Sequence, residues 1–586
     1  MAVEQLITEN IDLWTSAIKK KSATGRGSSK KIELYGIKKL RELILELAVR
    51  GKLVSQDLTD EPASELLKQI EAEKSQLIKD KKIKKPKKLP EILEDEKPFE
   101  LPKGWYYERL GNIGLIFNGN SVNARIKEEK YSCLSEGLPF IATKDVGYGF
   151  EELEYSNGIM IPVGEPKFKV ANKGAVLVCA EGGSAGKKCG IANQNICFGN
   201  KLFANELFGN IEPRFVLSSY LTPTFYNQFS ASMTGIIGGI SSAKFSELVI
   251  ALPPLKEQQR IVAKVDELMA LCDRLESQTE SSLEAHETLV QVLLTTLTDS
   301  KNAEELNQNW HRVSEHFDTL FTTEQSIDQL KQTILQLAVM GKLVPQNLND
   351  EPASVLLEKI AEEKVQLIKD KKIKKQKPLP PISDEEKPFE LPKGWEWVKC
   401  QELCIKITDG EHSTPQRAES GNYLLSARNV TNEGILLHDV DFVPDAEFTR
   451  IRKRCDPNIG DILISCSGSV GRVALVDSNN TYSMVRSAAM IRPNKDNLLK
   501  EYLALMLRSP YLQLQMKNRS KQSAQANLFL GAIANLVAVI PPLNEQERIV
   551  SKVDDLMTLC EQLKTNINNA QTTQLNLTDA IVDSST

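Results

Sequence analysis

One stretch of the sequence comes close to a phosphate-binding loop. It is Glu181 to Lys188, which reads EGGSAGKK. A GxxxxGK[ST] loop binds phosphates through backbone N–H groups, a lysine and a hydroxyl, so it would need glycine at position 181 and serine or threonine at 188. Neither requirement is met, and the stretch is interpreted as a hairpin turn.

Other catalytic patterns are also incomplete. Pro253-Pro254 and Pro541-Pro542 resemble the centre of an amino-methyltransferase motif, but they lack the preceding Asn or Asp and the following aromatic residue that hold the target amine. No GxSxG or HExxH pattern occurs. The five histidines and ten cysteines show no CxxC pair and no metal-ligand spacing, so reduced, structural cysteines are expected. The sequence therefore predicts no catalytic and no metal site.

The overall composition is that of a soluble protein with several domains. Of 586 residues, 41% are hydrophobic and 26% are charged. The net charge of −5 gives no general attraction to nucleic acid, so such a partner would need local basic residues or another subunit. No apolar run approaches about 18 residues, and the N-terminus has no basic region before an apolar stretch. A cytoplasmic location is expected.

The sequence repeats itself. Glu96 to Trp105 (EKPFELPKGW) recurs unchanged at Glu386 to Trp395, and the segments DEPAS, IKDKKIKK and LPPLKEQQRIV have counterparts in the other half. Between these matched frames, residues 104–252 and 394–540 have nearly the same length but share little sequence. A matched scaffold with unmatched inserts indicates one task performed on two different targets.

Each insert combines short β-branched runs with Gly and Asn turns, which predicts a β-rich mixed domain. The expected fold class is α+β, with two such domains separated by long antiparallel coiled-coil helices and related by a pseudo-two-fold internal repeat. The expected segments are a helical region (1–103), the first insert (104–252), a central region with a long helix and a second helical unit (253–393), the second insert (394–540) and a C-terminal helix (541–586).

Apolar residues step by alternating threes and fours after each Pro-Pro pair, which predicts a coiled-coil seam on a helix from Lys256 to near Thr298 and on its counterpart. The seam residues are Ile261, Val265, Leu268, Cys272 and Leu275 in the first copy, and Ile549, Val553, Leu556, Cys560 and Leu563 in the second. We expect the two seams to pack against each other. The alternative is that each helix packs on its own insert domain.

A second helix precedes each insert, over about Ala63 to Lys82 and Ala353 to Lys372. Asp60 and Asp350 are expected to cap these helices. Their ends carry the lysine-rich runs KDKKIKKPKK and KDKKIKKQK. A solvated tail that complements the helix dipole is one interpretation of the lysines, and a contact with phosphate or with another subunit is the other.

The order of these features resembles the specificity subunit of type I restriction-modification systems, over essentially the whole chain. The resemblance rests on LPKGW, on TKDV or SARN, on GDILIS followed by GSVGR, and on PPL.EQ.RI. Within the second insert, TDGEHSTPQ followed by LSARN is a specific match, whereas FNGNSVNAR in the first insert lacks that DGxHxTP run. The lysine-rich segments are most similar to the type IB subgroup. The resemblance implies that the inserts are two target recognition domains for DNA.

Side chains in the matched stretches are the candidates for DNA contact, because arginine pairs with guanine, asparagine with adenine, and serine, threonine or arginine with phosphate. In the second insert they are Asp409, His412, Thr414, Ser426, Arg428, Asn429 and Arg472. Internal alignment adds Thr143, Lys144, Asp145, Lys187 and Lys188 in the first insert. For each residue singly, a structural role in a turn is an equally good interpretation.

The resemblance also implies the partners. They are double-stranded DNA, two methyltransferase subunits and restriction or motor subunits. This chain is expected to bind no cofactor, while the complex would use S-adenosylmethionine, and ATP and Mg²⁺ with the restriction subunit. Two unlike readers in one chain suit a bipartite, asymmetric site. The rival interpretations are a stand-alone DNA methyltransferase or nuclease with fused recognition domains, and a tandem adaptor that binds only proteins.

Overall fold

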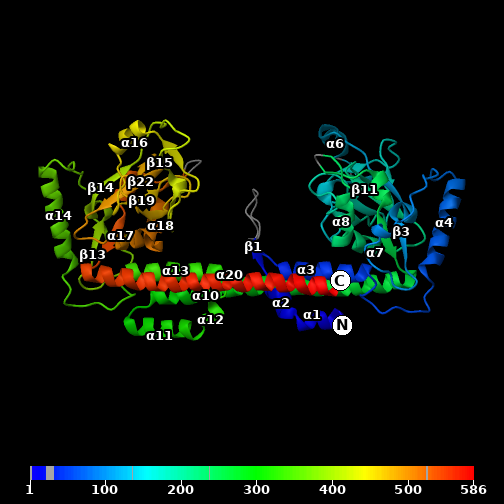
Figure 1. The fold of residues 1–586 in the computed structure, drawn as a ribbon, viewed down its shortest axis with the longest axis horizontal. Helices are drawn as coiled ribbons and strands as arrows, with labels where there is room; N and C mark the ends of the chain where they lie inside the picture. The colour runs from blue at the N-terminus through cyan, green and yellow to red at the C-terminus, as the bar shows by residue number, and fades with distance from the viewer. Residues whose placement is uncertain (1–2, 21–31, 133, 135, 236–237, 523–525) are drawn as a thin grey trace. The chain divides into compact units, whose positions relative to one another are not determined.

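The computed structural model describes residues 3–20, 32–132, 134, 136–235, 238–522 and 526–586 (Figure 1). The chain folds as two compact units. Unit 1 comprises Met1–Ser282 and Ala570–Thr586, and unit 2 comprises Leu283–Asn569. Each unit contains one insert, and residues 104–252 and 394–540 are called the first and second insert domains.

Two long helices connect the units. Helix α10 (Leu255–Asp299) and helix α20 (Leu543–Ser585) each begin directly after a Pro-Pro pair, as predicted. Proline is tolerated there because the first helical residues have no N–H partner within the helix. The first part of α10 belongs to unit 1 and its end to unit 2, while α20 begins in unit 2 and ends in unit 1. The two helices therefore run in opposite directions between the units, which confirms the expected fold class.

The seam residues are buried, but each seam lies in the core of its own unit. In unit 1, the seam of α10 packs with helix α3 (Tyr35–Val49) and with Ile581 and Val582 near the end of α20. In unit 2, the seam of α20 packs with helix α13 (Glu324–Val339) and with Val290 and Leu294 of α10. The expectation that the two seams cover each other is wrong. Both seams lie in the first halves of their helices, and antiparallel helices of equal length place the first half of one beside the last half of the other.

The larger sheets of the two insert domains have the same topology, although the domains share little sequence. The larger sheet of the first has the order β4 (Gly114–Asn118), β11 (Leu202–Leu207), β8 (Val176–Cys179), β9 (Cys189–Ile191). The larger sheet of the second has the order β14 (Cys404–Asp409), β22 (Ala488–Pro493), β19 (Ile462–Ser465), β20 (Val473–Leu475). All neighbouring strands in both sheets are antiparallel. The EGGSAGKK stretch connects β8 to β9, so its interpretation as a hairpin turn is confirmed.

A smaller sheet in each domain contains one parallel pair. In the first domain the order is β6 (Met160–Ile161), β5 (Leu138–Ile141), β10 (Ile196–Phe198), β7 (Val170–Ala171), and β5 and β10 are parallel. In the second domain the order is β18 (Asp441–Val443), β15 (Asn422–Leu425), β21 (Tyr482–Met484), and β15 and β21 are parallel. The pseudo-repeat therefore extends through the inserts.

Each insert domain begins and ends in one antiparallel pair of strands. Strand β3 (Tyr106–Arg109) pairs with β12 (Val249–Leu252), and β13 (Glu396–Lys399) pairs with β25 (Val537–Ile540).

Other helices of unit 1 are α1 (Val3–Glu9), α2 (Ile11–Ser16), α5 (Leu110–Ile113), α6 (Ala124–Tyr131), α7 (Pro213–Tyr220), α8 (Pro223–Ala231) and α9 (Ser242–Glu247). Those of unit 2 are α11 (Ala303–Glu315), α12 (Phe317–Leu320), α15 (Cys400–Leu403), α16 (Asp445–Arg452), α17 (Lys500–Arg508), α18 (Pro510–Arg519) and α19 (Leu530–Ala534). Short strand pairs are β1 (Lys19–Lys20) with β2 (Ile32–Glu33), β16 (Val430–Thr431) with β17 (Gly434–Ile435), and β23 (Lys521–Gln522) with β24 (Ala526–Asn527).

The repeated residues build the same joint between helix and insert domain in each unit. Trp105 Nε1 donates to Glu257 Oε2 at 3.0 Å, and Trp395 Nε1 donates to Glu545 Oε2 at 3.1 Å. Gly51 adopts a φ of 67° at the end of α3, where an added Cβ would meet the side chains of Pro102 and Trp105. The matched decapeptide and the matched helix start recur because together they form one tertiary contact.

The expected helix caps are wrong. Helices α4 (Ala63–Lys79) and α14 (Ala353–Lys369) have proline at the N-cap, without a side-chain cap bond. The Asp60 carboxylate instead pairs with Arg260 at 2.6 Å, and Asp350 pairs with Arg548 at 2.8 Å. In each unit, an arginine of the long helix thus forms an ion pair with the aspartate that was expected to cap the shorter helix.

The described cysteines are structural, as the sequence predicts. The nine described cysteines are buried and unpaired, and Cys133 lies outside the described residues. None of the described helices is long and apolar enough to cross a membrane.

Candidate nucleic-acid interface

In the second insert domain, strand β15 leads into the 3-10 turn η4 (Ala427–Asn429). The Asn429 side chain is buried, and both of its polar atoms are bonded. Its Oδ1 accepts from the backbone N–H of Ser426 at 2.9 Å and from the Ser426 hydroxyl at 3.1 Å. Its Nδ2 donates to the carbonyls of Leu436 at 2.9 Å and Asp439 at 3.0 Å. Asn429 and Ser426 therefore hold this turn in shape.

The first insert domain has an equivalent turn, η2 (Thr143–Asp145), after strand β5. Asp145 is buried at the position equivalent to Asn429. Its Oδ2 accepts from the backbone N–H of Ala142 at 2.8 Å and from Nδ2 of Asn157 at 3.0 Å. Two different side chains thus perform the same positioning role in the two domains.

The residue at the tip of each turn is an exposed cation. Lys144 occupies this position in the first domain and Arg428 in the second. The Arg428 guanidinium lies 3.2 Å from Asp441 Oδ1 and 3.5 Å from Asp439 Oδ2, and the side chain is 47% exposed. A buried polar neighbour fixes each turn and leaves a positive charge in solvent.

The β8–β9 hairpin brings two further predicted residues to the first turn. Lys188 donates from Nζ to the carbonyl of Thr143 at 3.0 Å, and its Nζ lies 5.1 Å from the centroid of the Tyr148 ring. Lys187 lies over the ring of Tyr226 in α8, at 5.5 Å. The structure therefore places Thr143, Lys144 and Lys188 together, while Lys187 points to a different neighbour.

In the second domain, the equivalent hairpin carries Arg472 at its end. The Arg472 backbone N–H donates to the Ser465 hydroxyl at 2.9 Å, and its side chain is exposed. The backbone N–H of Ala427 donates to the Ser487 hydroxyl at 3.0 Å. The turn η4 is therefore bonded to the residue directly before strand β22. Both matched segments of the inserts therefore form loops that expose a basic side chain.

The predicted residues of the TDGEHSTPQ loop form a charged cluster with Arg454, which lies two residues beyond the end of helix α16. His412 Nε2 lies 2.8 Å from Asp409 Oδ2, and the Arg454 guanidinium donates to Asp409 Oδ1. Partial burial acts to raise the pKa of the Asp409 carboxyl, but the hydrogen bonds from Arg454 and His412 outweigh it and hold that pKa below its usual value. Asp409 therefore orients two basic groups, and both of these side chains are about half exposed.

Glu411 determines the shape of the same loop. Its Oε1 accepts from the backbone N–H of Ser413 at 2.9 Å and from the Ser413 hydroxyl at 2.7 Å, and its Oε2 accepts from Arg450 at 2.9 Å. The hydrogen bonds from Ser413 and the charge of Arg450 lower the pKa of Glu411 to about 2. Thr414, the next residue in the loop, is exposed.

Arg450 and Arg454 are not among the residues predicted from the sequence, although both contact the loop. Their signal in the sequence is the run TRIRKR at the end of α16, where every second residue from Arg450 to Arg454 is arginine. Arg452, between them, points inward and donates to the carbonyl of Tyr482 at 2.6 Å. Periodicity alone does not separate the inward arginine from the other two.

The first insert domain has a different structure at the corresponding position. After β4, Asn123 Oδ1 accepts from the backbone N–H of Arg125 at 2.9 Å and caps helix α6. Asn118 and Asn120 instead bind Lys169, with Lys169 Nζ at 3.0 Å from the Asn118 carbonyl and the Lys169 backbone N–H at 2.8 Å from Asn120 Oδ1. The two domains therefore share the turn with the cationic tip but differ in this second loop.

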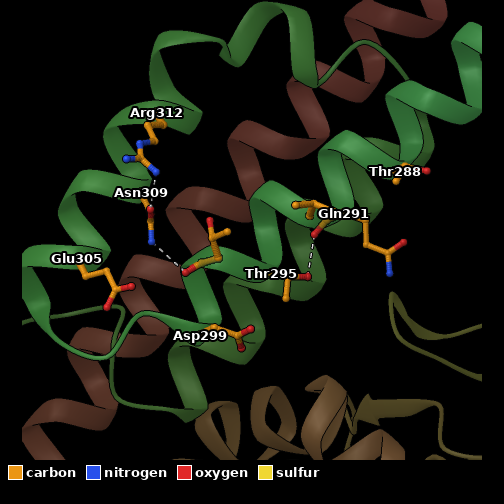
Figure 2. A pocket seen from close by; sticks show the side chains of 9 residues that line it. Thr288, Gln291, Thr295, Asp299, Glu305, Asn309 and Arg312 are labelled. Carbon is orange, nitrogen blue, oxygen red and sulfur yellow. Dashed lines mark hydrogen bonds between the residues drawn. The ribbon is translucent and has the colours of Figure 1, made fainter.

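A groove of about 650 Å³ lies outside the insert domains, between α10 and α11 in unit 2 (Figure 2). Asn309 Nδ2 donates to the carbonyl of Thr296 at 3.2 Å, and Asn309 Oδ1 accepts from Arg312 at 3.5 Å. Thr295 Oγ1 donates to the carbonyl of Gln291 at 2.8 Å (Figure 2). The bond from Asn309 to Thr296 joins α11 to α10, whereas the other two lie within one helix each, and the groove contains none of the predicted DNA contacts. Among the described residues, no group of three or more His, Cys, Asp or Glu side chains is placed to hold a metal ion.

Comparison with known proteins identifies the family. Residues 102–285 and 392–571 each match the family described as "Type I restriction modification DNA specificity domain". The chain is 42% identical to the type I restriction enzyme EcoAI specificity subunit of Escherichia coli, over 100% of this chain and 99% of that one. It is 41% identical to the EcoEI specificity subunit of Escherichia coli, again over 100% of this chain and 99% of the relative.

A solved structure supports the fold. A chain described under complex assembly and conformational transition of the type I R-M system matches with a TM-score of 0.50 and 18% identity, over 83% of this chain and 99% of that chain. The two matched regions correspond to the two insert domains with the starts of the long helices, and the full-length relatives are specificity subunits. The chain therefore belongs to the specificity subunits of type I restriction-modification systems, and its insert domains are two target recognition domains.

Proposed function

We propose that each recognition domain reads one half of a bipartite site in double-stranded DNA. The observation that supports this most directly is the pair of equivalent turns. Buried Asp145 and Asn429 fix the two turns, and exposed Lys144 and Arg428 occupy their tips. A cation held on a preformed turn can approach phosphates or base edges without paying the entropy of ordering a loop.

The two half-sites differ in sequence. The larger sheets of the domains have the same topology, but the second domain adds the Asp409, His412 and Arg454 cluster, which does not occur among the described residues of the first. A symmetric homodimer is tied to a palindrome, whereas two unlike readers in one chain select an asymmetric site. The bases between the half-sites are not contacted.

The predicted residues divide into two roles. Those with exposed charged or hydroxyl groups contact DNA, and they are Lys144, Lys187, His412, Thr414, Arg428 and Arg472, joined by Arg454 and by the half-buried Lys188. Those bonded within the protein position the others, and they are Thr143, Asp145, Asp409, Ser426 and Asn429. A positioning residue affects binding through the loop that it holds.

Each unit also offers an equivalent surface to a partner protein. Leu58 is 80% exposed and Leu348 is 79% exposed, at matching positions of the two scaffolds. Each leucine lies at the tip of a loop that the Asp60–Arg260 or Asp350–Arg548 pair fastens to a long helix. Two equal apolar tips suit two copies of one partner, and the proposed partner is the methyltransferase subunit of the system.

Catalysis belongs to the partner subunits in this proposal. The methyltransferase subunits use S-adenosylmethionine, and restriction or motor subunits use ATP and Mg²⁺. The chain itself is non-catalytic and acts in the cytoplasm. Its described residues contain no metal-ligand cluster, and the stretch nearest to a phosphate loop is the β8–β9 hairpin.

The test is to map modified adenines by single-molecule sequencing in cells with and without this chain, in the presence of its methyltransferase partner. We expect one bipartite, asymmetric sequence to carry the modification only when the chain is present. A palindromic pattern, or a pattern independent of the chain, would contradict the proposal. Methyl transfer by the purified chain alone would establish the enzymatic alternative, and absence of any footprint by the complex would favour a protein-binding adaptor.

A further inference from the structure

Two exposed lysine-rich segments follow helices α4 and α14, and the proposed recognition of bases makes no use of them. The first lysine arm is Lys79–Lys88, with seven lysines and one aspartate, and the second lysine arm is Lys369–Lys377, with six lysines and one aspartate. Every lysine in both arms is exposed. The whole chain carries a net charge of −5, so the arms concentrate positive charge in a protein that is otherwise acidic.

Each arm leaves its helix through the same defined turn. The backbone N–H of Lys82 donates to the carbonyl of Leu77 at 2.9 Å, and that of Lys81 donates to the carbonyl of Ile78 at 3.1 Å. The second arm repeats both bonds with Lys372 and Lys371, at 2.9 Å and 3.0 Å. This pattern is a Schellman C-cap, which fixes the direction in which the chain continues. The arms therefore begin from a fixed position on each unit.

The residue at the centre of each cap is unusual for its conformation. Lys81 has a φ of 55° and Lys371 a φ of 56°. Glycine or asparagine is favoured there, since a side chain of the L configuration is strained in the left-handed region. The other described non-glycine residues with positive φ are asparagines, Asn210 and Asn480. Lysine at the cap of both arms costs stability, so folding does not explain why it is there.

The arms are also left without neutralising partners. In the two arms, all of whose residues the structure describes, one lysine forms an ion pair, and this is Lys372 with Asp370 of the same arm at 3.5 Å. Exposed lysines earlier in the same region do find carboxylates, because Lys68 pairs with Glu65 at 2.7 Å and Lys359 with Glu351 at 2.6 Å. The positive charge of the arms is therefore available to an outside partner.

Both arms are attached to a recognition domain. In unit 1, Leu66 and Ile70 of α4 pack at Gly209, whose backbone N–H donates to Glu73 Oε2 at 2.7 Å. In unit 2, Lys364 of α14 donates to the carbonyl of Gln401 at 2.8 Å. Figure 1 shows α4 beside the first recognition domain and α14 beside the second. The helix from which each arm leaves is therefore fixed on a recognition domain.

We propose that the two lysine arms bind the phosphate backbone of double-stranded DNA, without reading its bases. This inference rests on the proposed function, because it assumes that the recognition domains hold DNA. Duplex DNA carries about one negative charge per 1.7 Å of its length, which gives closely spaced lysines many equivalent partners. Contacts of this kind set affinity and salt dependence but add no sequence preference.

The test uses the full chain in complex with its methyltransferase partner. One variant replaces Lys84, Lys85, Lys87, Lys88, Lys374, Lys375 and Lys377 by glutamine. The matched control carries Lys68→Gln and Lys359→Gln, which remove exposed but paired lysines from the same helices. Binding to duplexes with and without the modified sequence is measured between about 50 and 200 mM salt.

Each lost phosphate contact lowers the slope of log Kd against log salt by about 0.9. Loss of about three contacts therefore reduces the change in Kd over this salt range by about 40-fold. We expect this reduction on both duplexes. The complex should still modify the same DNA sequence, and the control should have the salt slope of the wild type. An unchanged slope would overturn the inference, as would loss of methyltransferase binding with normal DNA binding, which would assign the arms to a protein partner.

A second variant separates charge from folding. Lys81→Gly with Lys371→Gly relieves the backbone strain and removes two charges. We expect a Tm equal to or above that of the wild type, together with a smaller salt slope. A higher Tm with unchanged DNA binding would contradict a role for these two lysines. If the wild-type complex fails to distinguish the two duplexes, the proposed function fails, and the salt slope still reports on the arms.

Discussion

The roles of Asn429 and Arg428, which are neighbours in one turn, can be separated by substitution. Asn429→Ala removes four hydrogen bonds in a site that is 2% exposed. The Ser426 hydroxyl can turn to another partner, but the Ser426 N–H and the carbonyls of Leu436 and Asp439 lose theirs. Since the net loss of one hydrogen bond costs about 0.5–1.5 kcal/mol and three bonds are lost without replacement, we expect unit 2 to lose about 2–4 kcal/mol of unfolding free energy.

Arg428→Ala should have the opposite profile. Its side chain is 47% exposed, and its carboxylate partners lie 3.2 and 3.5 Å away, so the pairs contribute about 0–1 kcal/mol to stability. DNA binding should nevertheless weaken, by about 1–3 kcal/mol if the guanidinium reads a base, with relaxed specificity at one position of the half-site.

Chemical denaturation and DNA-binding measurements on both variants test these two roles. Equal stability of the Asn429 variant and the wild type would refute the assignment of a buried positioning role. Normal affinity and specificity of the Arg428 variant, with the modified sequence unchanged, would refute the contact role. Asp145→Asn in the first domain is the matched control. Its amide oxygen can still accept from the backbone N–H of Ala142, so we expect a smaller loss of stability than in the Asn429 variant.

Three further substitutions test other parts of the structure. Lys144→Ala should weaken DNA binding and lower the salt slope by about 1, and an unchanged slope in a binding titration would remove Lys144 from the interface. Leu58→Ser with Leu348→Ser should reduce co-purification of the methyltransferase, because burial of each leucine contributes about 1.5–3 kcal/mol, and full retention of both copies would place the docking surface elsewhere. Burial raises the pKa of Glu257, against the hydrogen bond from Trp105. Above the unfolded pKa, near 4.5, the folded protein therefore holds a proton that the unfolded chain has lost, and stability falls as the pH rises through the folded pKa. Glu257→Gln should flatten this fall in denaturation curves recorded at increasing pH, whereas an unaltered pH profile would show that Glu257 is not its source.

Much of the scaffold follows from local sequence signals. The Pro-Pro pairs and the heptad-like spacing after them predict helix starts and buried faces, and the structure has both. These signals suffice because helix periodicity and proline geometry act over a few residues. The prediction that Asp60 caps α4 is wrong because it depends on a contact that is distant in the chain. A carboxylate beside a helix start can also bind a distant guanidinium, and Arg260 is 200 positions away in the chain.

By itself, the sequence determined that the protein is a duplicated scaffold with two unlike inserts, because repetition, spacing and composition are properties of the chain. Only the tertiary structure decided that the larger sheets of the unlike inserts share one topology, and that adjacent residues of one turn have different roles. The physical reason is that a polar side chain is free to bind DNA only if the fold does not already satisfy it. For Asn429, the groups that satisfy it include two carbonyls further along the chain, at Leu436 and Asp439, and no local pattern indicates that they turn back toward it.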